Sequence, residues 1–326
     1  MIMRKWDSKE LELVKCDFCG AHEFCAEYLR GDGMRVVECA ICGLAYLNPR
    51  PLKNLIPRFY EEEYFTGVMA ERGEGGLKLE LGIAGKDPIL EGKKRIPRPI
   101  ELINDRFGGM QGKDVLEIGC ATGDLLSRMV QEGARARGLE ISDFAARIAR
   151  SRGMEVTTGT IEDYLASEVK TFDIVMAFEV IEHVTSPIRF FESVVKCIKP
   201  GGLLLLSTPN YSCSSRYGGA WFGFNCSFEH LYFFNAETLK RLACKAGCTL
   251  QYWETTMWNG GPTQVRHDFL YKNLNRLSRL LYFVTEEDKT IMGALRAFLS
   301  RKSSHRALGS GHTITAVFRN DARSLS

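Results

Sequence analysis

Residues 114–126 read DVLEIGCATGDLL, an apolar run that leads through Gly119 and Gly123 into a helical pattern. The run 114–119 predicts a buried strand, and LLSRMVQEG at 125–133 has the i, i+3, i+4 spacing of an amphipathic helix. Glycine lets the backbone pass close to a ligand, and the helix that follows offers free N–H groups in its first turn. We therefore expect a ligand-binding turn between this strand and this helix.

Strand and helix patterns alternate from residue 112 to about residue 256. Ser186-Pro187 and Asn235 have the residue types of helix N-termini, and Gly247 has that of a helix C-terminus. This alternation predicts an α/β fold, in which a parallel sheet has helices on both faces. The further strand candidates are 134–141, 155–159, 172–178, 202–210 and 312–318, and the further helix candidates are 143–153, 187–202 and 235–247.

The composition argues against several classes of protein. The 326 residues are 45% hydrophobic and 25% charged, which is typical of a soluble globular chain. A net charge of +3 gives no electrostatic reason to propose nucleic acid or an anionic membrane as the partner. The N-terminus lacks the apolar core of a signal peptide, and LLLL at 203–206 is too short to span a bilayer. We expect a cytoplasmic protein with a small-molecule partner, and the sequence leaves its oligomeric state open.

Two CxxCG motifs near the N-terminus predict a metal site. VKCDFCG and VECAICG place Cys16–Cys19 and Cys39–Cys42 nineteen residues apart, within the spacing range of a zinc ribbon. His22 and Cys25 lie between the pairs at spacings that fit less well, and we expect them not to be ligands. Four thiolates close the coordination shell, so Zn²⁺ would have a structural role. An iron–sulfur cluster is the alternative.

Three other segments follow strand candidates and should lie at the same sheet edge as the glycine turn. Glu140 comes 21 residues after Gly119, where a carboxylate can accept both hydroxyls of a ribose. GTIED at 159–163 follows the third strand candidate and could frame the edge of an adenine. FDIVMAFEVIEHV at 172–184 ends in a cluster of acidic residues and a histidine. The sequence thus predicts an adenosine-containing ligand at the carboxyl edge of the sheet.

The ordered set EIGCATG, GLEIS, EVIEHV and IKPGG resembles the class I S-adenosylmethionine-dependent methyltransferases over roughly residues 98–256. The resemblance implies a Rossmann-like seven-stranded sheet that ends with strand 312–318, and S-adenosylmethionine (SAM) as cofactor. A dinucleotide-binding sheet is the alternative. However, the third glycine of G-x-G-x-x-G is absent, and acidic surroundings suit a sulfonium cation better than a pyrophosphate.

The resemblance also implies which residues contact SAM. Thr160 stands where the family commonly has an acidic residue, so it departs from the pattern at the adenine edge. The residues implied are Glu117, Gly119, Cys120 and Gly123 at the methionine end, Glu140 at the ribose, Ile141 on the adenine face, Thr160, Ile161 and Glu162 at the adenine edge, and Phe178 and Glu179.

The order of the segments resembles bacterial methyltransferases of deoxysugar, polysaccharide and natural-product pathways, including zinc-binding sugar C-methyltransferases. NPRP at 48–51 and FYEEEYF at 59–65 lie between the ribbon and the core. Those sugar enzymes are usually longer than this chain, so O-methylation is favoured over C- or N-methylation. We divide the chain into a zinc-binding ribbon (1–50), a linker with lid helices (51–111), a SAM-binding core (112–256), a helical insertion that would act as a substrate lid (257–311), and the last strand and tail (312–326).

Methyl transfer requires an aligned acceptor and removal of its proton, and a histidine is the usual base. Glu229-His230 in SFEHLYFF matches a Glu-His pair that is implicated in proton removal in the sugar C-methyltransferases. We expect His230 to be the base, oriented by Glu229, with His183 as the second candidate. The alternative for His230 is to tie a loop over the cofactor.

Glu179, Glu182 and His183 have i, i+3, i+4 spacing and would share one face of a helical turn. The arrangement resembles that of ubiquinone-pathway O-methyltransferases, in which the equivalent residues are associated with a divalent cation such as Mg²⁺. The other interpretation, which we favour, is a structural motif of the cofactor pocket.

Several aromatic residues are candidates for shaping the acceptor site. Tyr60 and Tyr64 would pack or position substrate at an N-terminal lid. Trp221, Phe222 and Phe224 would line an acceptor pocket or fill the core, and we favour the pocket.

Two other functions stay open. Zinc ribbons also precede the cores of rRNA base-modifying enzymes, so an RNA methyltransferase is the second hypothesis. The near-neutral charge and the non-basic stretch 16–42 argue against it. The third hypothesis is a binding module that keeps the cofactor pocket without turnover.

Overall fold

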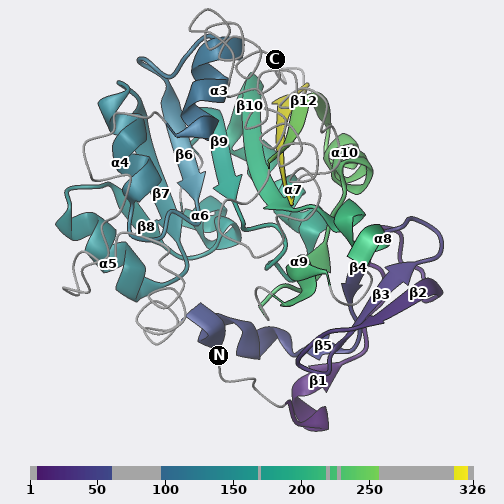
Figure 1. Cartoon of the computed structure of the whole chain (residues 1–326). Helices are drawn as coiled ribbons and strands as arrows, with labels where there is room; N and C mark the ends of the chain where they lie inside the picture. The colour runs from purple at the N-terminus through teal and green to yellow at the C-terminus, as the bar shows by residue number, and fades with distance from the viewer. Residues whose placement is uncertain are drawn as a thin grey trace, which may run out of the picture.

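The computed structural model describes residues 6–60, 97–167, 170–217, 221–225, 229–256 and 312–321. Figure 1 shows a central twisted sheet with helices on both sides, and a smaller sheet from the N-terminal residues beside it. In the described part of the chain, no helix has the length and apolar content needed to cross a bilayer. The predicted insertion 257–311 lies outside the described residues, as does Tyr64.

The central sheet has seven strands in the order β12-β13-β10-β9-β6-β7-β8. The first strand of this sheet, β6, lies between β9 and β7, and the chain winds outward to β8 before it returns to β9 on the other side. β13 is antiparallel to both of its neighbours, whereas β8, β7, β6, β9 and β10 are parallel. The predicted Rossmann-like seven-stranded fold is therefore confirmed. The strands are β6 (Asp114–Ile118), β7 (Arg135–Glu140), β8 (Val156–Thr158), β9 (Phe172–Phe178), β10 (Ile198–Pro209), β12 (Cys248–Thr256) and β13 (Thr313–Asn320).

Helices cover both faces because successive strand residues point to opposite sides. Leu116 of β6 joins the core under α6, α7 and α10, while its neighbour Val115 joins the core under α3, α4 and α5. The side chains of Ser186 and Asn235 accept backbone N–H bonds at the starts of α7 and α10, as predicted. The helices are α3 (Arg98–Arg106), α4 (Asp124–Gln131), α5 (Asp143–Ser151), α6 (Ile161–Ser167), α7 (Pro187–Lys196) and α10 (Ala236–Lys245).

One predicted helix and one edge strand differ from the structure. The helix expected over 187–202 ends at Lys196, and β10 begins at Ile198 with a register shift before Leu203. The irregular start accommodates Pro200-Gly201-Gly202, which cannot extend a helix. Strand β12 was not predicted, because it lies at the sheet edge and mixes polar with apolar residues.

The N-terminal residues form a second sheet that takes one strand from the core. Its order is β11-β4-β3-β2, and β11 (Tyr232–Phe233) pairs antiparallel with β4 through Tyr232 opposite Tyr46. Val36 and Leu47 of the ribbon share one hydrophobic core with Phe191 and Leu204. The sheet thus crosses the boundary that the sequence suggested at residue 50. Its strands are β2 (Phe24–Leu29), β3 (Arg35–Cys39) and β4 (Ala45–Leu47), and β1 (Leu11–Glu12) pairs with β5 (Arg50–Pro51).

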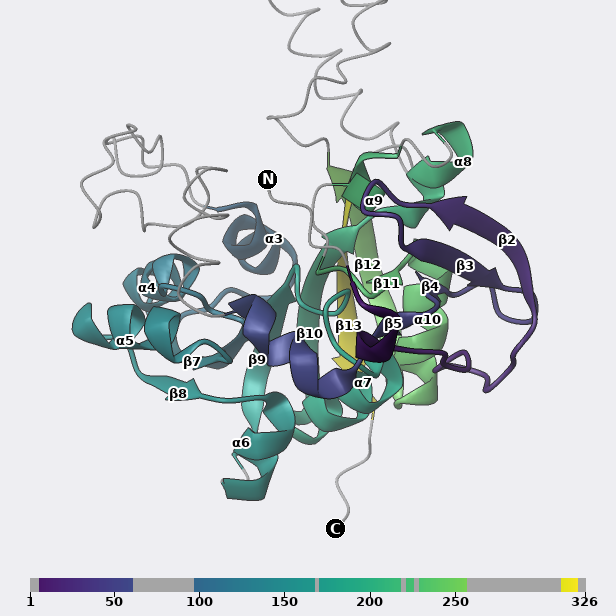
Figure 2. The same cartoon turned by 90° about the horizontal axis from the view of Figure 1, so that it is seen from below.

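A short 3-10 helix, η2 (Lys53–Tyr60), leads from the ribbon to the carboxyl edge of the central sheet. Figure 2, the view from below, shows this dark blue segment crossing in front of β9 and β10. Leu55 and Ile56 are buried, and Ile56 packs into the main core. The helix therefore covers part of the carboxyl edge, where ligands bind in sheets of this type.

Candidate active site

The glycine turn after β6 is shaped by its backbone. Gly119 has φ 73°, and a Cβ there would lie 2.6 Å from Cγ2 of Val180. Gly123 has φ 84° and precedes the first residue of α4. Ala121 between them has φ 47°, which is costly for a residue other than glycine. The turn therefore needs both glycines, as the sequence indicated, and it holds a strained residue at the predicted site.

Glu140 ties the end of β7 to this turn. Its side chain is 5% exposed. Oε2 accepts the N–H of Ala121 at 2.8 Å, and Oε1 accepts the N–H of Ser142 at 2.9 Å. Burial raises the pKa of Glu140, and these backbone donors oppose the shift. Each oxygen keeps a further lone pair, so the carboxylate can still accept two hydroxyls of a ligand.

Glu117 gives the turn a second buried carboxyl group. Its Oε2 is buried and has no hydrogen-bond partner among the described residues. Burial raises the pKa of Glu117 well above its ordinary value, and the negative charges of Glu140 and Asp124 raise it further. A cation bound beside Glu117 would offset both effects. This acidic surround fits a sulfonium group and opposes a pyrophosphate.

A second group of titratable side chains lies where the chain leaves β9. The rings of His183 and His230 are 4.7 Å apart, edge to face. Oε1 of Glu182 lies 4.0 Å from Nε2 of His230, and the ring of Tyr60 lies 6.0 Å from that of His183. Glu182 and His230 are 1% and 4% exposed. The structure thus brings together the two predicted bases, residues 47 positions apart, beside a buried carboxyl group.

Burial raises the pKa of Glu182 well above its ordinary value, and the charge of Glu179 adds to the effect. A carboxyl group of raised pKa beside an imidazole forms a pair in which either group can hold a shared proton. The 4.0 Å separation is longer than a hydrogen bond, as is common for catalytic groups before substrate binds. The imidazole of His230 can therefore take a proton from the hydroxyl group of a substrate bound beside it.

The four predicted metal ligands converge in the ribbon. The Sγ atoms of Cys16 and Cys42 are 3.3 Å apart, and those of Cys19 and Cys39 are 3.5 Å apart. All four Sγ atoms lie within 4.8 Å of one another. Burial raises the pKa of Cys42 to about 11, and it also raises that of Cys16. Buried thiols become thiolates readily only beside a cation, and this donor set fits tetrahedral Zn²⁺.

Comparison with known proteins agrees with this geometry. The family model described as methyltransferase domain matches residues 92–252. This part of the chain is a class I S-adenosylmethionine-dependent methyltransferase domain. The family's cofactor is SAM, whose sulfonium and ribose match the charges and acceptors of the glycine turn.

Three similar proteins illustrate the relationship. A ubiquinone biosynthesis O-methyltransferase of Vibrio parahaemolyticus is 34% identical over 36% of this methyltransferase and 53% of its own length. One of Klebsiella pneumoniae is 33% identical over 38% of this chain and 52% of its own length. The chain therefore spans about half the length of these curated relatives. The crystal structure of magnesium protoporphyrin IX methyltransferase from Synechocystis, solved with bound SAH, aligns with 16% identity and a TM-score of 0.46 over 64% of this chain and 94% of that one.

The other residues predicted to contact SAM in this methyltransferase lie at the ends of β6 to β9. Ile141 follows β7 and is 38% exposed, whereas Ile161 is buried. The N–H and hydroxyl of Thr160 both donate to Oδ2 of Asp163, so Thr160 caps the start of α6. Cys120 is buried, Glu162 is exposed and Phe178 is half-buried.

The structure changes three expectations about the acceptor side. The segment after β9 is a turn rather than a helix, and Glu179 has φ 53° and accepts the hydroxyl of Ser207 at 2.7 Å. On the acceptor side of the described residues, the group whose ligand atoms lie close enough to share a metal ion is Glu182, His183 and His230, without Glu179. Trp221 and Phe224 are 1% and 0% exposed and fill the core, so the preference for a pocket was wrong for these two.

The carboxyl group that approaches His230 is that of Glu182, which sequence reasoning had paired with Glu179 and His183. The role of Glu229 in orienting His230 stays a prediction. Sequence reasoning also missed Arg30, whose Nη1 donates to the carbonyl of His230 at 3.0 Å. The only local signal for Arg30 was the turn RGDG after a strand-like run.

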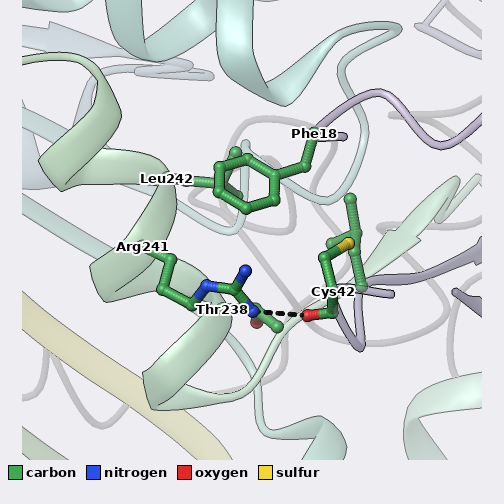
Figure 3. A pocket seen from close by; sticks show the side chains of 6 residues that line it. Phe18, Cys42, Thr238, Arg241 and Leu242 are labelled. Carbon is green, nitrogen blue, oxygen red and sulfur yellow. Dashed lines mark hydrogen bonds between the residues drawn. The ribbon is translucent and has the colours of Figure 1, made fainter. Parts of the chain in front are cut away.

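A small cleft between the ribbon and α10 is distinct from this site. Figure 3 shows Arg241 donating from Nη1 to the carbonyl of Cys42, a contact of 2.9 Å. The cleft leaves almost no space even for a water molecule, so it is a packing groove and not a ligand pocket. Arg241 and Lys245 also lie over the ring of Phe18. These contacts attach the ribbon, which carries the four cysteines, to the core. The lining residues are Phe18, Cys42, Leu44, Thr238, Arg241 and Leu242.

Proposed function

We propose that this methyltransferase transfers the methyl group of SAM to an oxygen of a small molecule, such as a sugar, a polysaccharide precursor or a secondary metabolite. The observation that carries the proposal is the contact between the half-buried His183 and the buried His230, with Glu182 4.0 Å from His230, beyond β9 of the same sheet. The relatives named above are O-methyltransferases, which supports transfer to oxygen.

Separate groups of residues contact the cofactor and the methyl acceptor. SAM supplies an electrophilic methyl group on a sulfonium. Glu140 accepts the ribose hydroxyls, and Glu117 places a negative charge near the methionine end. Ile141 packs on the adenine, with Ile161 and Glu162 at its edge. These contacts orient the methyl group for in-line displacement, which is the main source of rate in a reaction of this kind.

His230 acts as the base on the acceptor side. It removes the proton of the acceptor hydroxyl, and an oxygen of Glu182 accepts a hydrogen bond from the resulting imidazolium. Tyr60 on η2 limits the site from the ribbon side and helps to exclude water. His183 packs against His230 and restricts its ring orientation.

The cysteine cluster holds a structural Zn²⁺ in this proposal. A closed shell of four thiolates leaves no position for substrate. Its function is to keep the ribbon folded, so that β4 can pair with β11 next to His230.

The test uses purified zinc-loaded protein with SAM that carries a ¹³C-labelled methyl group. Nucleotide-sugars and hydroxylated secondary metabolites are screened by mass spectrometry, and NMR of the product shows whether the methyl group is on oxygen or carbon. A carbon-bound methyl group would assign C-methylation instead. Methylation of an RNA substrate, with binding that weakens as salt is added, would assign the RNA function.

A divalent cation is tested in the same assay. Loss of turnover after brief EDTA treatment at unchanged zinc content, with recovery in Mg²⁺, would assign Glu182, His183 and His230 to a cation instead of proton removal. Turnover that persists in EDTA supports His230 as the base.

A further inference from the structure

Arg30 is a buried cation in the turn between β2 and β3, far in sequence from the proposed base. It is 2% exposed and lies 200 residues before His230. Its Nε and Nη2 donate to the two carboxylate oxygens of Asp32 at 2.9 and 2.5 Å. Its third contact, from Nη1, reaches the carbonyl of His230 at 3.0 Å. One planar group therefore joins the ribbon turn to the backbone of His230.

The ribbon turn that carries Arg30 is itself well ordered by hydrogen bonds. Oδ1 of Asp32 also accepts the N–H of Met34 at 3.1 Å, and the N–H of Arg30 donates to the carbonyl of Met34. Because the guanidinium fork has a rigid shape, a carboxylate that binds two of its nitrogens fixes the direction of the third. Asp32 thus aims Nη1 at His230.

The core holds the next two residues from the opposite side. The N–H groups of Leu231 and Tyr232 both donate to the carbonyl of Glu182, at 2.8 and 3.1 Å. The carbonyl of Leu231 accepts the N–H of Leu47 from the ribbon at 2.9 Å. The peptide groups around His230 are therefore clamped between the ribbon and the turn after β9.

We propose that Arg30 is a positioning residue for methyl transfer, which fixes the backbone of His230 so that its imidazole faces Glu182 and the acceptor. The inference rests on the proposed role of His230 as base. The ribbon then contributes to catalysis because it fixes the position of the base. The zinc itself takes no part in the reaction. Loss of this contact should lower kcat and leave cofactor affinity unchanged.

The experiment compares Arg30→Met and Arg30→Lys with Arg35→Met in the full zinc-loaded chain. Arg35 lies in the same hairpin, but its ion pair with Glu27 is exposed, which makes it a matched control. Since Arg30→Met leaves Asp32 buried without its cation, the double variant Arg30→Met/Asp32→Asn is included in case the single variant fails to fold. SAH binding by calorimetry and zinc content by atomic absorption confirm that each variant is intact.

The readout independent of turnover is histidine NMR of protein with ¹³C-labelled imidazoles, with the His230 signal assigned from His230→Asn. Arg30→Met should shift the His230 signal and its titration midpoint, Arg30→Lys should do so less, and Arg35→Met should leave them unchanged. With an acceptor from the screen, kcat should fall about a hundredfold for Arg30→Met. An unshifted His230 signal in a folded Arg30 variant would overturn the proposal. Absence of turnover in the wild type would instead count against the proposed function, with the NMR test still valid.

Discussion

The two halves of the proposed active site are built in different ways. Most of the proposed cofactor half comes from one continuous stretch, residues 117–163, in which short turns after β6, β7 and β8 bring Glu117 and Glu140 to the same edge. The acceptor half is assembled from Tyr60, His183 and His230, which lie on three separate segments. The first half is local and repeats a family pattern, whereas the second depends on packing between the ribbon and the core.

The difference shows where selectivity for the acceptor can arise. The glycine turn must present the same backbone and carboxylates to an invariant ligand, so little in it can change. The acceptor half is held by contacts such as that of Arg50, whose Nη1 donates to the carbonyl of Thr185 at 2.7 Å. Changes in the ribbon can therefore reshape the acceptor site without disturbing the cofactor site. Four substitutions test this difference between the two halves.

The largest effect is expected from removal of a metal ligand. Cys16→Ser should abolish zinc binding and lower the free energy of unfolding by about 3 kcal/mol or more, since loss of a metal is among the most destabilising changes. If the halves are independent, SAH binding should survive while turnover is lost. Zinc content, urea unfolding and calorimetry measure the three quantities. Cys25→Ser, at an exposed cysteine outside the cluster, is the control, and equal zinc loss in both variants would contradict the assignment.

His230→Ala should produce the next largest change. A general base contributes about 10²–10⁴-fold to the rate, so kcat should fall within that range while the Kd for SAH stays constant. Steady-state kinetics with the acceptor from the screen measures the effect. The exposed His22→Ala serves as the control. Wild-type kcat in His230→Ala would leave the residue with a structural role only.

Glu140→Gln addresses the cofactor half alone. Hydrogen bonds to a charged group contribute about 1.5–3 kcal/mol, so the Kd for SAH should rise about ten- to a hundredfold. Calorimetry gives the Kd, and Glu162→Gln at an exposed position is the control. The comparison would fail if this change also moved the NMR signal of His230, because the halves would then be coupled.

The last effect is on the pH dependence of folding and not on turnover. The pKa of Glu117 is raised in the folded state, so the unfolded chain loses this proton first as pH rises. The wild type should therefore lose stability from about pH 4.5 upward until the folded pKa is reached, by about 1.4 kcal/mol for each pH unit between the two pKa values. Glu117→Gln has no such loss.

Urea unfolding of the ligand-free proteins at pH 4.5 and pH 8 measures this difference. The stability of Glu117→Gln relative to wild type should rise between the two values, and that of Glu162→Gln should not. A constant difference for Glu117→Gln would show that its carboxyl group is not perturbed by burial.

Much of the fold could be predicted because its signals are local. Strand candidates 114–119 and 172–178 correspond to β6 and β9, and Ser186 and Asn235 cap helices as expected. Strand β12 and the early end of α7 could not be predicted from local signals. The hydrophobic pattern is weak in an edge strand and around the Pro-Gly-Gly segment. Trp221 and Phe224 were misjudged because an aromatic run looks the same whether it faces a pocket or a core.

The glycine turn, the carboxylates that follow it and the four cysteines that meet in the ribbon can be identified from the sequence. Each set lies within about 30 residues of chain, in motifs that place the side chains at the ends of neighbouring strands or turns. The pairing of β11 with the ribbon sheet, the approach of Glu182 to His230 and the contact of Arg30 with the carbonyl of His230 become apparent only in the folded protein. Those contacts join segments up to 200 residues apart. They depend on the burial of a shared core, which cannot be predicted from the local sequence pattern.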